Sequence, residues 1–354
     1  MLSLAVVIPC YRARRHILRV IAGVLPQVDA IYVVDDQCPE GTGDYVASAV
    51  SDPKVKVIRS PGNEGVGGAT MAGYAAAAAD GHDILIKMDG DDQMDPAYLA
   101  TLIAPIVRGH ADYTKGNRFF SRRFYGGMPP IRIFGNAILS FVTKISTGYW
   151  DIMDPTNGYT AIHASVLPLL EVERIAKRYF FETDMLFRLG LIRAVVRDVP
   201  IPARYRGEVS SLKIRNVLPT FLAAHAVRFA KRLIYQYFVR DLNVGSLQLV
   251  FAVLLLGFGG LFGISKWITG VRLDQEATSG TVMLAALPVI VGFQLWLAAI
   301  MYDVMKTPRE PIHPLLVPHK LRAPMLADAP MLAEVSAQHA PSLVPDPASE
   351  NVHS

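Results

Sequence analysis

The segment DILIKMDGDDQMDP, residues 83–96, combines side-chain types and spacing that point to metal chemistry. It begins as an apolar strand and ends in four acidic residues and an amide. Asp89, Asp91 and Gln93 alternate along an extended backbone, so their side-chain oxygens can converge on one hard cation. Carboxylates this close repel each other unless a metal neutralises them. We therefore predict a metal site at this strand end.

The last acidic residue of the segment has a structural explanation. Asp95 stands directly before Pro96, and an aspartate before a helix-opening proline is typical of an N-cap. We therefore predict a helix cap for Asp95. No role is assigned to Asp92.

Short apolar runs alternate with helical segments through about the first hundred residues. This alternation predicts a three-layer α/β domain with a mostly parallel sheet. In an open parallel sheet, ligands bind outside the carboxyl ends of the strands. The polar residues at those ends should therefore form one site. The expected strands are 4–9, 30–36, 55–58 and 83–88, with a helix at 65–79.

Polar residues stand at the end of each expected strand. Pro9 and Tyr11 follow the first strand, and Asp35 and Asp36 end the second. Asp35 or Asp36 is placed to accept hydrogen bonds from a base or a ribose. The glycine-rich stretch at 62–68 lacks the lysine of a P-loop and the last glycine of a dinucleotide fingerprint. It therefore indicates tight packing of a helix.

The apolar residues of this chain, which is 354 residues long and 51% hydrophobic, concentrate near its C-terminus. The segments 242–265 and 277–302 carry no formal charge, and each exceeds the roughly 30 Å hydrocarbon core when helical. We predict two membrane spans within 242–305. The preceding segment, 214–241, reads as an amphipathic juxtamembrane helix. Residues 306–354 lack periodicity and are expected to form a disordered cytoplasmic tail.

Positive charge lies mainly outside the loop between the two spans. This distribution predicts an inner-membrane protein whose domain at 1–213 and both termini face the cytoplasm. The first nine residues lack the basic region of a signal peptide. The net charge of +4 fits a membrane surface and not nucleic acid, since the basic residues do not form an aromatic-interleaved patch. Those beside the spans are Arg228, Lys231, Arg232, Arg240, Lys306 and Arg309, against Lys266 and Arg272 in the loop.

Taken together, these motifs resemble the GT-A glycosyltransferases of family 2. Further motifs and the two spans resemble, more narrowly, the polyprenyl-phosphate glycosyltransferases, which include dolichol-phosphate mannose synthase. The resemblance covers residues 4 to about 305. The motifs that carry it are VVIPCY (6–11), VVDDQCPEGT (33–42), Asn63 with its glycines, DGDDQ (89–93), KGNRF (115–119), DPTNGYTAI (154–162), FETDMLFRL (181–189) and VPIPARYRGEVSSLK (199–213).

The resemblance implies roles for individual residues. It implies Mg²⁺ or Mn²⁺ on Asp89, Asp91 and Gln93, and catalytic roles for Asp89, Asp91 and Arg118. The nucleotide-sugar would contact Pro9, Tyr11, Val34, Asp36, Met88, Asp89, Gly90 and Asp91. The acceptor or diphosphate would contact Arg118, Asp154, Arg204, Arg206 and Lys213.

The chain departs from the family pattern in two places. The family commonly has Ser-Gly-Phe-Arg where this chain has Asn157-Gly158-Tyr159-Thr160, so an expected cation is absent. Arg132 or Lys144 could supply it. The segment that holds Arg204, Arg206 and Lys213 matches the family only with an insertion.

The resemblance implies inverting transfer of a sugar from a UDP- or GDP-linked donor to undecaprenyl or dolichyl phosphate at the cytoplasmic membrane face. An acceptor phosphate is already anionic near neutral pH and needs no strong general base. Asp154 would then orient the acceptor or a basic neighbour, whereas a hydroxyl acceptor would make it the candidate base. Relatives form tetramers, so a homo-oligomer is expected. No residue identifies the sugar.

Two other functions are considered. A processive polysaccharide synthase of the same superfamily normally carries Gln-x-x-Arg-Trp, and none of Trp150, Trp267 or Trp296 follows an arginine. A non-catalytic membrane scaffold could bind nucleotide-sugar through a relict domain. The presence of Asp89, Asp91 and Gln93 together argues against that scaffold.

Overall fold

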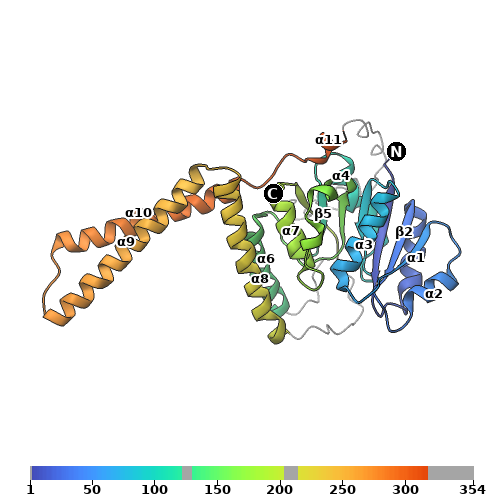
Figure 1. Ribbon diagram of the computed structural model, residues 1–354, viewed down its shortest axis with the longest axis horizontal. Coiled ribbons are helices and arrows are strands. Elements are labelled where there is room, and N and C mark those ends of the chain that lie inside the picture. Colours follow the sequence, from blue (N-terminus) through green and yellow to red (C-terminus); the bar gives the residue numbers. More distant parts are fainter. Residues whose placement is uncertain (1, 122–129, 203–213, 318–354) are drawn as a thin grey trace, which may run out of the picture.

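A seven-stranded sheet forms the centre of the computed structural model, which describes residues 2–121, 130–202 and 214–317 (Figure 1). The strands are β1 (Leu4–Cys10), β2 (Ala30–Asp35), β3 (Val55–Arg59), β4 (Ile84–Lys87), β5 (Tyr113–Asn117), β6 (Thr160–His163) and β7 (Val196–Pro200). Their order is β3-β2-β1-β4-β6-β5-β7. Only β6 is antiparallel to its neighbours β4 and β5. The predicted mostly parallel sheet is confirmed.

Helices cover both faces of this sheet. One face carries α1 (Ile17–Val24), α2 (Thr42–Ala49) and α4 (Leu99–Val107), and the other carries α3 (Gly65–Ala79) and α7 (Phe181–Leu191). Successive strand residues point to opposite faces. Val6 and Ile8 therefore pack with the first group of helices, while Ala5 and Val7 pack with the second. The three-layer domain is confirmed, and α3 matches the helix predicted at 65–79.

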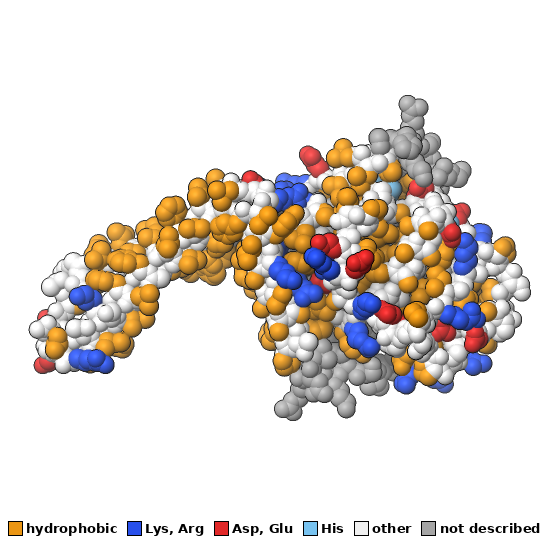
Figure 2. Space-filling view, viewed as in Figure 1, with side chains coloured by type: hydrophobic (Ala, Val, Ile, Leu, Met, Phe, Trp, Pro, Cys, Tyr) orange, Lys and Arg blue, Asp and Glu red, His pale blue; other side chains and the backbone are white. Residues whose placement is uncertain are grey.

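Two long apolar helices follow this domain. Helix α6 (Pro130–Thr147) packs beside α8 (Ile214–Ile234), and a π-helical turn at Tyr235–Val239 leads to α9 (Val244–Leu273) and α10 (Ser279–Met305). The last two form a hairpin that extends away from the sheet (Figure 1). Their most apolar windows have mean hydropathies of 2.3 and 2.1 and are only 11% buried. Hydrophobic side chains cover much of the hairpin (Figure 2), so both helices are candidate membrane spans.

The first candidate span is longer than the sequence predicted. The uncharged run ends at Ser265, but α9 continues through Lys266 and Arg272 to Leu273. A charged residue ends an uncharged run of sequence, but it does not end a helix. Long basic side chains near a helix end can also extend to the membrane interface.

The segment after α10 returns to the sheet domain. Its short helix α11 (His313–Leu316) lies beside Asp112, the residue before β5, and the His313 imidazole Nδ1 is 2.8 Å from Asp112 Oδ1. The backbone N–H groups of Ile312 and His313 also donate to Asp112, at 2.9 and 2.7 Å. The sequence places this segment in a disordered tail from residue 306, whereas the structure describes 306–317 as ordered. The segment lacks periodicity, but the backbone N–H groups of Ile312 and His313 hold it to the buried Asp112 carboxylate.

Candidate functional site

Two cavities open at carboxyl ends of the parallel strands, the larger at β1, β2 and β4 and the smaller at β4, β5 and β7. The larger cavity, about 410 Å³, is lined by residues that include Pro9, Tyr11, Asp36 and Gly90. The smaller, about 130 Å³, is lined by residues that include Gln93, Arg118, Asn157 and Gly158. Asp89 and Asp91 line both cavities. Asp89 and Asp91 therefore form a wall common to the two cavities, which we call the acidic wall.

Asp35, the last residue of β2, and Asp36, which follows it, have different roles. Asp36 lines the larger cavity, and its two carboxylate oxygens accept from the backbone N–H groups of Glu64 and Gly65, each at 2.7 Å. These bonds hold the carboxylate at the start of α3. Asp35 instead accepts from Cys38 and Gly43 N–H at 2.7 and 2.6 Å and fixes the loop before α2. Of the two aspartates considered from sequence, Asp36 therefore faces the cavity.

Other residues assigned to the nucleotide-sugar differ in how they reach the cavity. Tyr11 is 49% exposed, while the Val34 and Met88 side chains are fully buried on opposite faces of the sheet. Those two residues have only backbone atoms to offer a ligand. Gly90 belongs to the cavity wall, where a Cβ would lie 3.0 Å from that of Ala13.

The acidic wall offers hard oxygen donors from Asp89, Asp91 and Gln93, of the kind that Mg²⁺ and Mn²⁺ prefer. Gln93 donates its backbone N–H to Asp91 Oδ1 at 3.1 Å, which keeps the two residues together. Within the described parts of the chain, no three His, Cys, Asp or Glu side chains gather as a complete ligand set. The residues therefore fit a cation that also takes oxygen ligands from a bound phosphate.

The other two acidic residues of the segment have structural partners. Asp95 accepts from the Ala97 N–H at 3.0 Å, which confirms the predicted cap. Asp92 is buried, and its carboxylate lies 2.9 Å from the Arg19 guanidinium.

A buried lysine holds one side of the acidic wall. Lys87 Nζ lies 2.6 Å from Asp89 Oδ1 and 3.5 Å from Glu182 Oε1, at the start of α7. Burial lowers the pKa of Lys87, but these two carboxylates outweigh it and raise that pKa above its usual value. Gly158 makes the contact possible, since a Cβ there would lie 2.6 Å from Lys87 Nζ. Lys87 is thus a permanent cation that orients Asp89.

A second buried lysine lies beneath the smaller cavity. Lys115 is fully buried and donates to the Asn157 carbonyl. Burial lowers its pKa to about 8, although the carboxylates of Glu182 and Asp154 act in the opposite direction. Within the described residues, no carboxylate lies at ion-pair distance from Lys115. Its charge is therefore much less stabilised than that of Lys87.

The two lysines flank the position where the family arginine was expected. Thr160 is buried in β6 and pairs with Lys87 of β4 on one side and Lys115 of β5 on the other. Lys144 of α6 contacts a methionine sulfur at 3.5 Å, and the Arg132 side chain is outside the described residues. Positive charge at this level of the sheet thus comes from neighbouring strands.

No site role was assigned from the sequence to Lys87, Lys115 or Glu182. A usable signal was present. Lys87 interrupts the apolar run of a strand two residues before Asp89, where a charge must be buried and paired. The sequence does not indicate the partner, because Glu182 is 95 residues away.

Arg118 brings a partly exposed cation to the smaller cavity. It follows β5, and its Nε and Nη2 groups donate to Asp154 Oδ2 and Oδ1 at 2.7 and 2.9 Å. Its backbone N–H donates to the same carboxylate at 3.2 Å. Asp154 is fully buried, whereas the Arg118 side chain is 25% exposed. Arg204, Arg206 and Lys213 lie outside the described residues.

Comparison with known proteins identifies relatives of this chain. The model of the family described as glycosyl transferase family 2 matches residues 5–169. The undecaprenyl-phosphate mannosyltransferase of Micrococcus luteus is 34% identical over 183 residues, which are 50% of this chain and 72% of that protein. The UDP-N-acetylglucosamine–dolichyl-phosphate N-acetylglucosaminyltransferase of Methanococcus voltae is 29% identical over 229 residues, 61% of this chain and 90% of that protein.

Solved structures show the same fold at lower identity. Glucosyl-3-phosphoglycerate synthase of Mycobacterium tuberculosis, in complex with UDP, has a TM-score of 0.50 at 19% identity, covering 64% of this chain and 80% of that one. Mannosyl-3-phosphoglycerate synthase of Rubrobacter xylanophilus has a TM-score of 0.50 at 17% identity, covering 68% and 77%. At this identity the likeness concerns the fold alone.

Proposed function

The chain belongs to glycosyl transferase family 2, and on that premise we propose that it moves a sugar from a nucleotide-sugar to a polyprenyl phosphate at a membrane surface. The observation that carries the proposal is the acidic wall, Asp89 and Asp91, shared by two cavities. A donor in one cavity and an acceptor in the other would meet at that wall. The named activities of the Micrococcus and Methanococcus relatives support this acceptor class.

The larger cavity has the character expected of a donor site. Its volume of about 410 Å³ lies within the roughly 300–1,000 Å³ of small-molecule sites. Asp36 offers a fixed carboxylate to ribose or base hydrogen-bond donors, and exposed Tyr11 offers an aromatic face. We propose that Pro9, Gly90 and the backbone of Val34 and Met88 complete the donor surface.

Catalysis in this proposal depends on charge at the breaking bond to the leaving diphosphate. A divalent ion on Asp89, Asp91 and Gln93 would supply Lewis-acid stabilisation of that charge, worth several kcal/mol. Lys87 orients Asp89 by a 2.6 Å contact. Arg118 presents a guanidinium to the smaller cavity, where it can bind phosphate oxygens.

The arrangement supports inversion at the anomeric carbon. An acceptor that enters from the smaller cavity faces the acidic wall from the side opposite the nucleotide, as direct displacement requires. Both Asp154 oxygens accept from Arg118, so Asp154 suits orientation of that cation and not proton abstraction. A phosphate acceptor fits this chemistry, because it needs no strong base. Arg204, Arg206 and Lys213 remain proposed acceptor ligands.

The molecule also carries features expected for an acceptor held in a bilayer. Four apolar side chains of α6 are exposed: Ile131, Phe134, Ile138 and Phe141. Residues 306–317 contact the sheet domain. If the hairpin crosses the membrane and returns, the sheet domain and residues 306–317 therefore lie on the same side of it. We propose that this is the cytoplasmic side of the inner membrane. We further propose a homo-oligomer, for which a monomeric mass in detergent would be contrary evidence.

Transfer assays on the purified full chain test the proposal. The substrates are a panel of UDP- and GDP-sugars and a short-chain polyprenyl phosphate, with lipid-linked sugar as the measured product. We expect at least one donor to give product, EDTA to abolish it and added Mg²⁺ or Mn²⁺ to restore it. Asp91→Asn should lower the rate about 1,000-fold, because the wall loses a charged ligand.

The matched control is Asp92→Asn, the same change one residue along. Asp92 is paired with Arg19, and asparagine tolerates its positive φ of 63°, so activity should stay within about threefold. Product that survives EDTA or Asp91→Asn would refute the metal site. Transfer to a glycan hydroxyl in place of the lipid phosphate would refute the acceptor.

A further inference from the structure

A separate polar pocket, which we call the junction pocket, lies where the sheet domain meets the apolar hairpin. It is about 60 Å³ and is lined by residues that include Thr147, Arg193, Arg232, Asn243, Asp303 and Lys306. Arg193 precedes the amino end of β7, which runs parallel to β5, whereas the two cavities open at carboxyl ends of strands. Among the described residues, none lines both the junction pocket and either of those cavities.

The deepest charges of the junction pocket neutralise each other. Arg232 donates to Asp303 Oδ1 and Oδ2 at 2.6 and 3.1 Å. Asp303 also accepts from the Tyr237 hydroxyl and from Trp150 Nε1, both at 2.8 Å. With four donors on two oxygens, the carboxylate is saturated and has little attraction left for other cations. This pair therefore forms the floor.

The carbonyl groups at the end of α7 are also occupied. Arg240 Nη1 donates to the Leu191 carbonyl at 2.6 Å, and Gln236 Nε2 donates to the Gly190 carbonyl at 3.2 Å. A helix C-terminus attracts cations through such carbonyls. Since they already have donors, this attraction does not account for Arg193.

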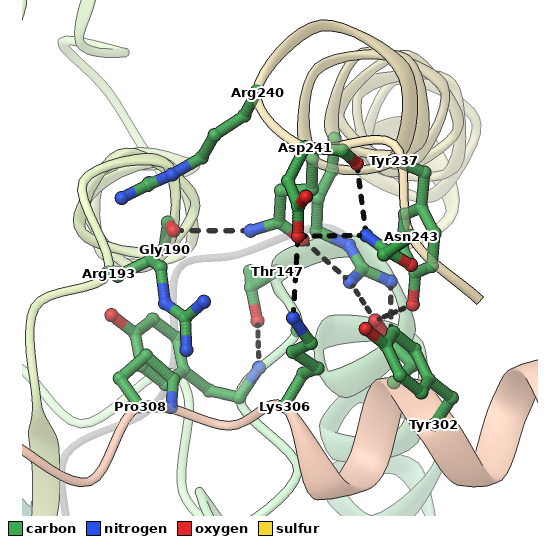
Figure 3. Close-up of a pocket in the computed structure, with 15 residues that line it drawn as sticks. Thr147, Gly190, Arg193, Tyr237, Arg240, Asp241, Asn243, Tyr302, Lys306 and Pro308 are labelled. Carbon is green, nitrogen blue, oxygen red and sulfur yellow. Dashed lines mark hydrogen bonds and ion pairs between the residues drawn. The ribbon is translucent and has the colours of Figure 1, made fainter. Parts of the chain in front are cut away.

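Two cations remain above the floor, Arg193 and Lys306. Figure 3 shows both side chains reaching into the junction pocket from different segments, with Thr147 between them. Within the described residues, the Arg193 guanidinium has no hydrogen bond or ion pair. Lys306 Nζ lies over the Tyr302 ring and 3.6 Å from the exposed Asp241, which also lines the pocket. The junction pocket therefore presents an excess of positive charge.

The backbone of Arg193 is unusual in a way that suits a binding role. Its φ is 60°, the left-handed conformation that follows a helix and that favours glycine. An arginine in this conformation costs folding free energy, of the kind that accumulates at functional sites. This backbone conformation places the half-buried Arg193 side chain at the wall of the junction pocket.

The junction pocket lies at the level where the candidate spans meet water. Asn243 directly precedes α9, and Lys306 directly follows α10. Basic pockets at this level bind the head groups of anionic lipids. The small volume admits a phosphate group but not a nucleotide, for which roughly 300 Å³ or more is needed. We propose that the junction pocket binds the phosphate group of an anionic phospholipid through Arg193 and Lys306.

Native mass spectrometry of the full chain in detergent tests the proposal, with phosphatidylglycerol and phosphatidylcholine as the lipid probes. Wild type should retain phosphatidylglycerol in preference to phosphatidylcholine. The variant Arg193→Gly/Lys306→Gln should bind phosphatidylglycerol about 30-fold more weakly, because two interfacial cations are lost. Glycine suits the backbone at position 193, so the variant should fold, which its unfolding temperature will verify.

The control is Lys266→Gln/Arg272→Gln, which removes two exposed cations near the far end of the hairpin. It should retain phosphatidylglycerol like wild type. A thermal-shift titration with inorganic phosphate separates the two sources of this chemistry: stabilisation of wild type but not of the pocket variant would identify a soluble phosphate in place of the lipid. Equal phosphatidylglycerol binding by wild type and the pocket variant would overturn the proposal.

Discussion

Two buried carboxylate–guanidinium pairs, built from the same groups, stand in different regions of this molecule. Arg118 and Asp154 lie at the smaller cavity, with bonds of 2.7 and 2.9 Å. Arg232 and Asp303 lie at the hairpin junction, with bonds of 2.6 and 3.1 Å. The Arg118 side chain is 25% exposed, whereas that of Arg232 is 3% exposed.

The difference between the pairs lies in what surrounds them. Asp303 accepts two further hydrogen bonds, and Arg232 also donates to the Ile145 carbonyl at 2.7 Å, so this pair joins α6, α8 and α10. The Arg118 side chain is 25% exposed and lines a cavity that could hold a phosphate. A bidentate arginine–carboxylate pair is therefore structural when the arginine's surroundings are protein, and it can contribute to ligand binding when the arginine lines a cavity.

The largest expected effect separates structure from function at the junction. Asp303→Ala leaves Arg232 buried without its carboxylate, which should lower the free energy of unfolding by about 3–5 kcal/mol. Denaturant unfolding of the full chain in detergent measures this loss. Asp241→Ala removes an exposed partner of Lys306 and should change stability by less than about 1 kcal/mol. Equal losses in the two variants would show that the Asp303 network is not a structural centre.

The same substitution, arginine to lysine, tests whether the two pairs have different roles. Lysine keeps the charge but not the planar fork that makes two parallel bonds. Arg118→Lys should lower the rate of sugar transfer about 100-fold with stability changed by less than about 1 kcal/mol. Arg232→Lys should do the reverse: it should destabilise the protein by about 2 kcal/mol and leave the rate per folded molecule unchanged.

Initial rates and unfolding midpoints, measured on the same preparations, decide this prediction. If both variants lose stability and neither loses rate, Arg118 is structural and the smaller cavity needs a different phosphate ligand. If both lose rate at full stability, the junction is coupled to the site, and the distinction between the two pairs fails.

The part of this fold that was predictable from sequence is the part whose signals are local. The runs at β1, β2 and β4 are short, apolar and β-branched, and Gly81 follows the alanine-rich helix α3. Because parallel strands end at one edge, the meeting of Pro9, Asp36 and Asp89 also followed from the sequence. The sequence also grouped Asp89 and Asp91, but the extended backbone expected for them was wrong: β4 ends at Lys87, and both residues lie beyond it at a turn where Asp92 has a φ of 63°.

Features that depend on distant partners were not predictable. Lys87 is paired by Glu182, and Asp303 is bound by Trp150 across 153 residues. The insertion of antiparallel β6 between β4 and β5 reverses the order of the chain, so neighbours at Thr160 could not be inferred. The ordered segment that contacts Asp112 lacks the periodicity on which sequence interpretation depends.

The smallest expected effect concerns Lys115, a buried cation that has no carboxylate partner in the described part of the chain, whereas both arginines have one. Its pKa is about 8 in the fold and near 10.5 when unfolded. Between these values the unfolded chain binds more protons, so stability should rise with pH in that window. Below pH 8 the cost of burying the charge is fully present. Lys115→Met removes the titration, so its stability advantage over wild type should shrink by about 2 kcal/mol from pH 7.5 to 10.

Lys54→Met is the matched control for this pH dependence. Lys54 also donates to a backbone carbonyl, that of Val28 at 2.9 Å, but it is exposed. Its effect on stability should be small at both pH values, because an exposed ammonium keeps its hydration. If Lys115→Met and wild type differ by the same amount at pH 7.5 and 10, Lys115 is stabilised as fully as Arg118 and Arg232. A buried cation without a carboxylate partner would then be as stable as one that has such a partner, which would contradict the comparison of the two pairs.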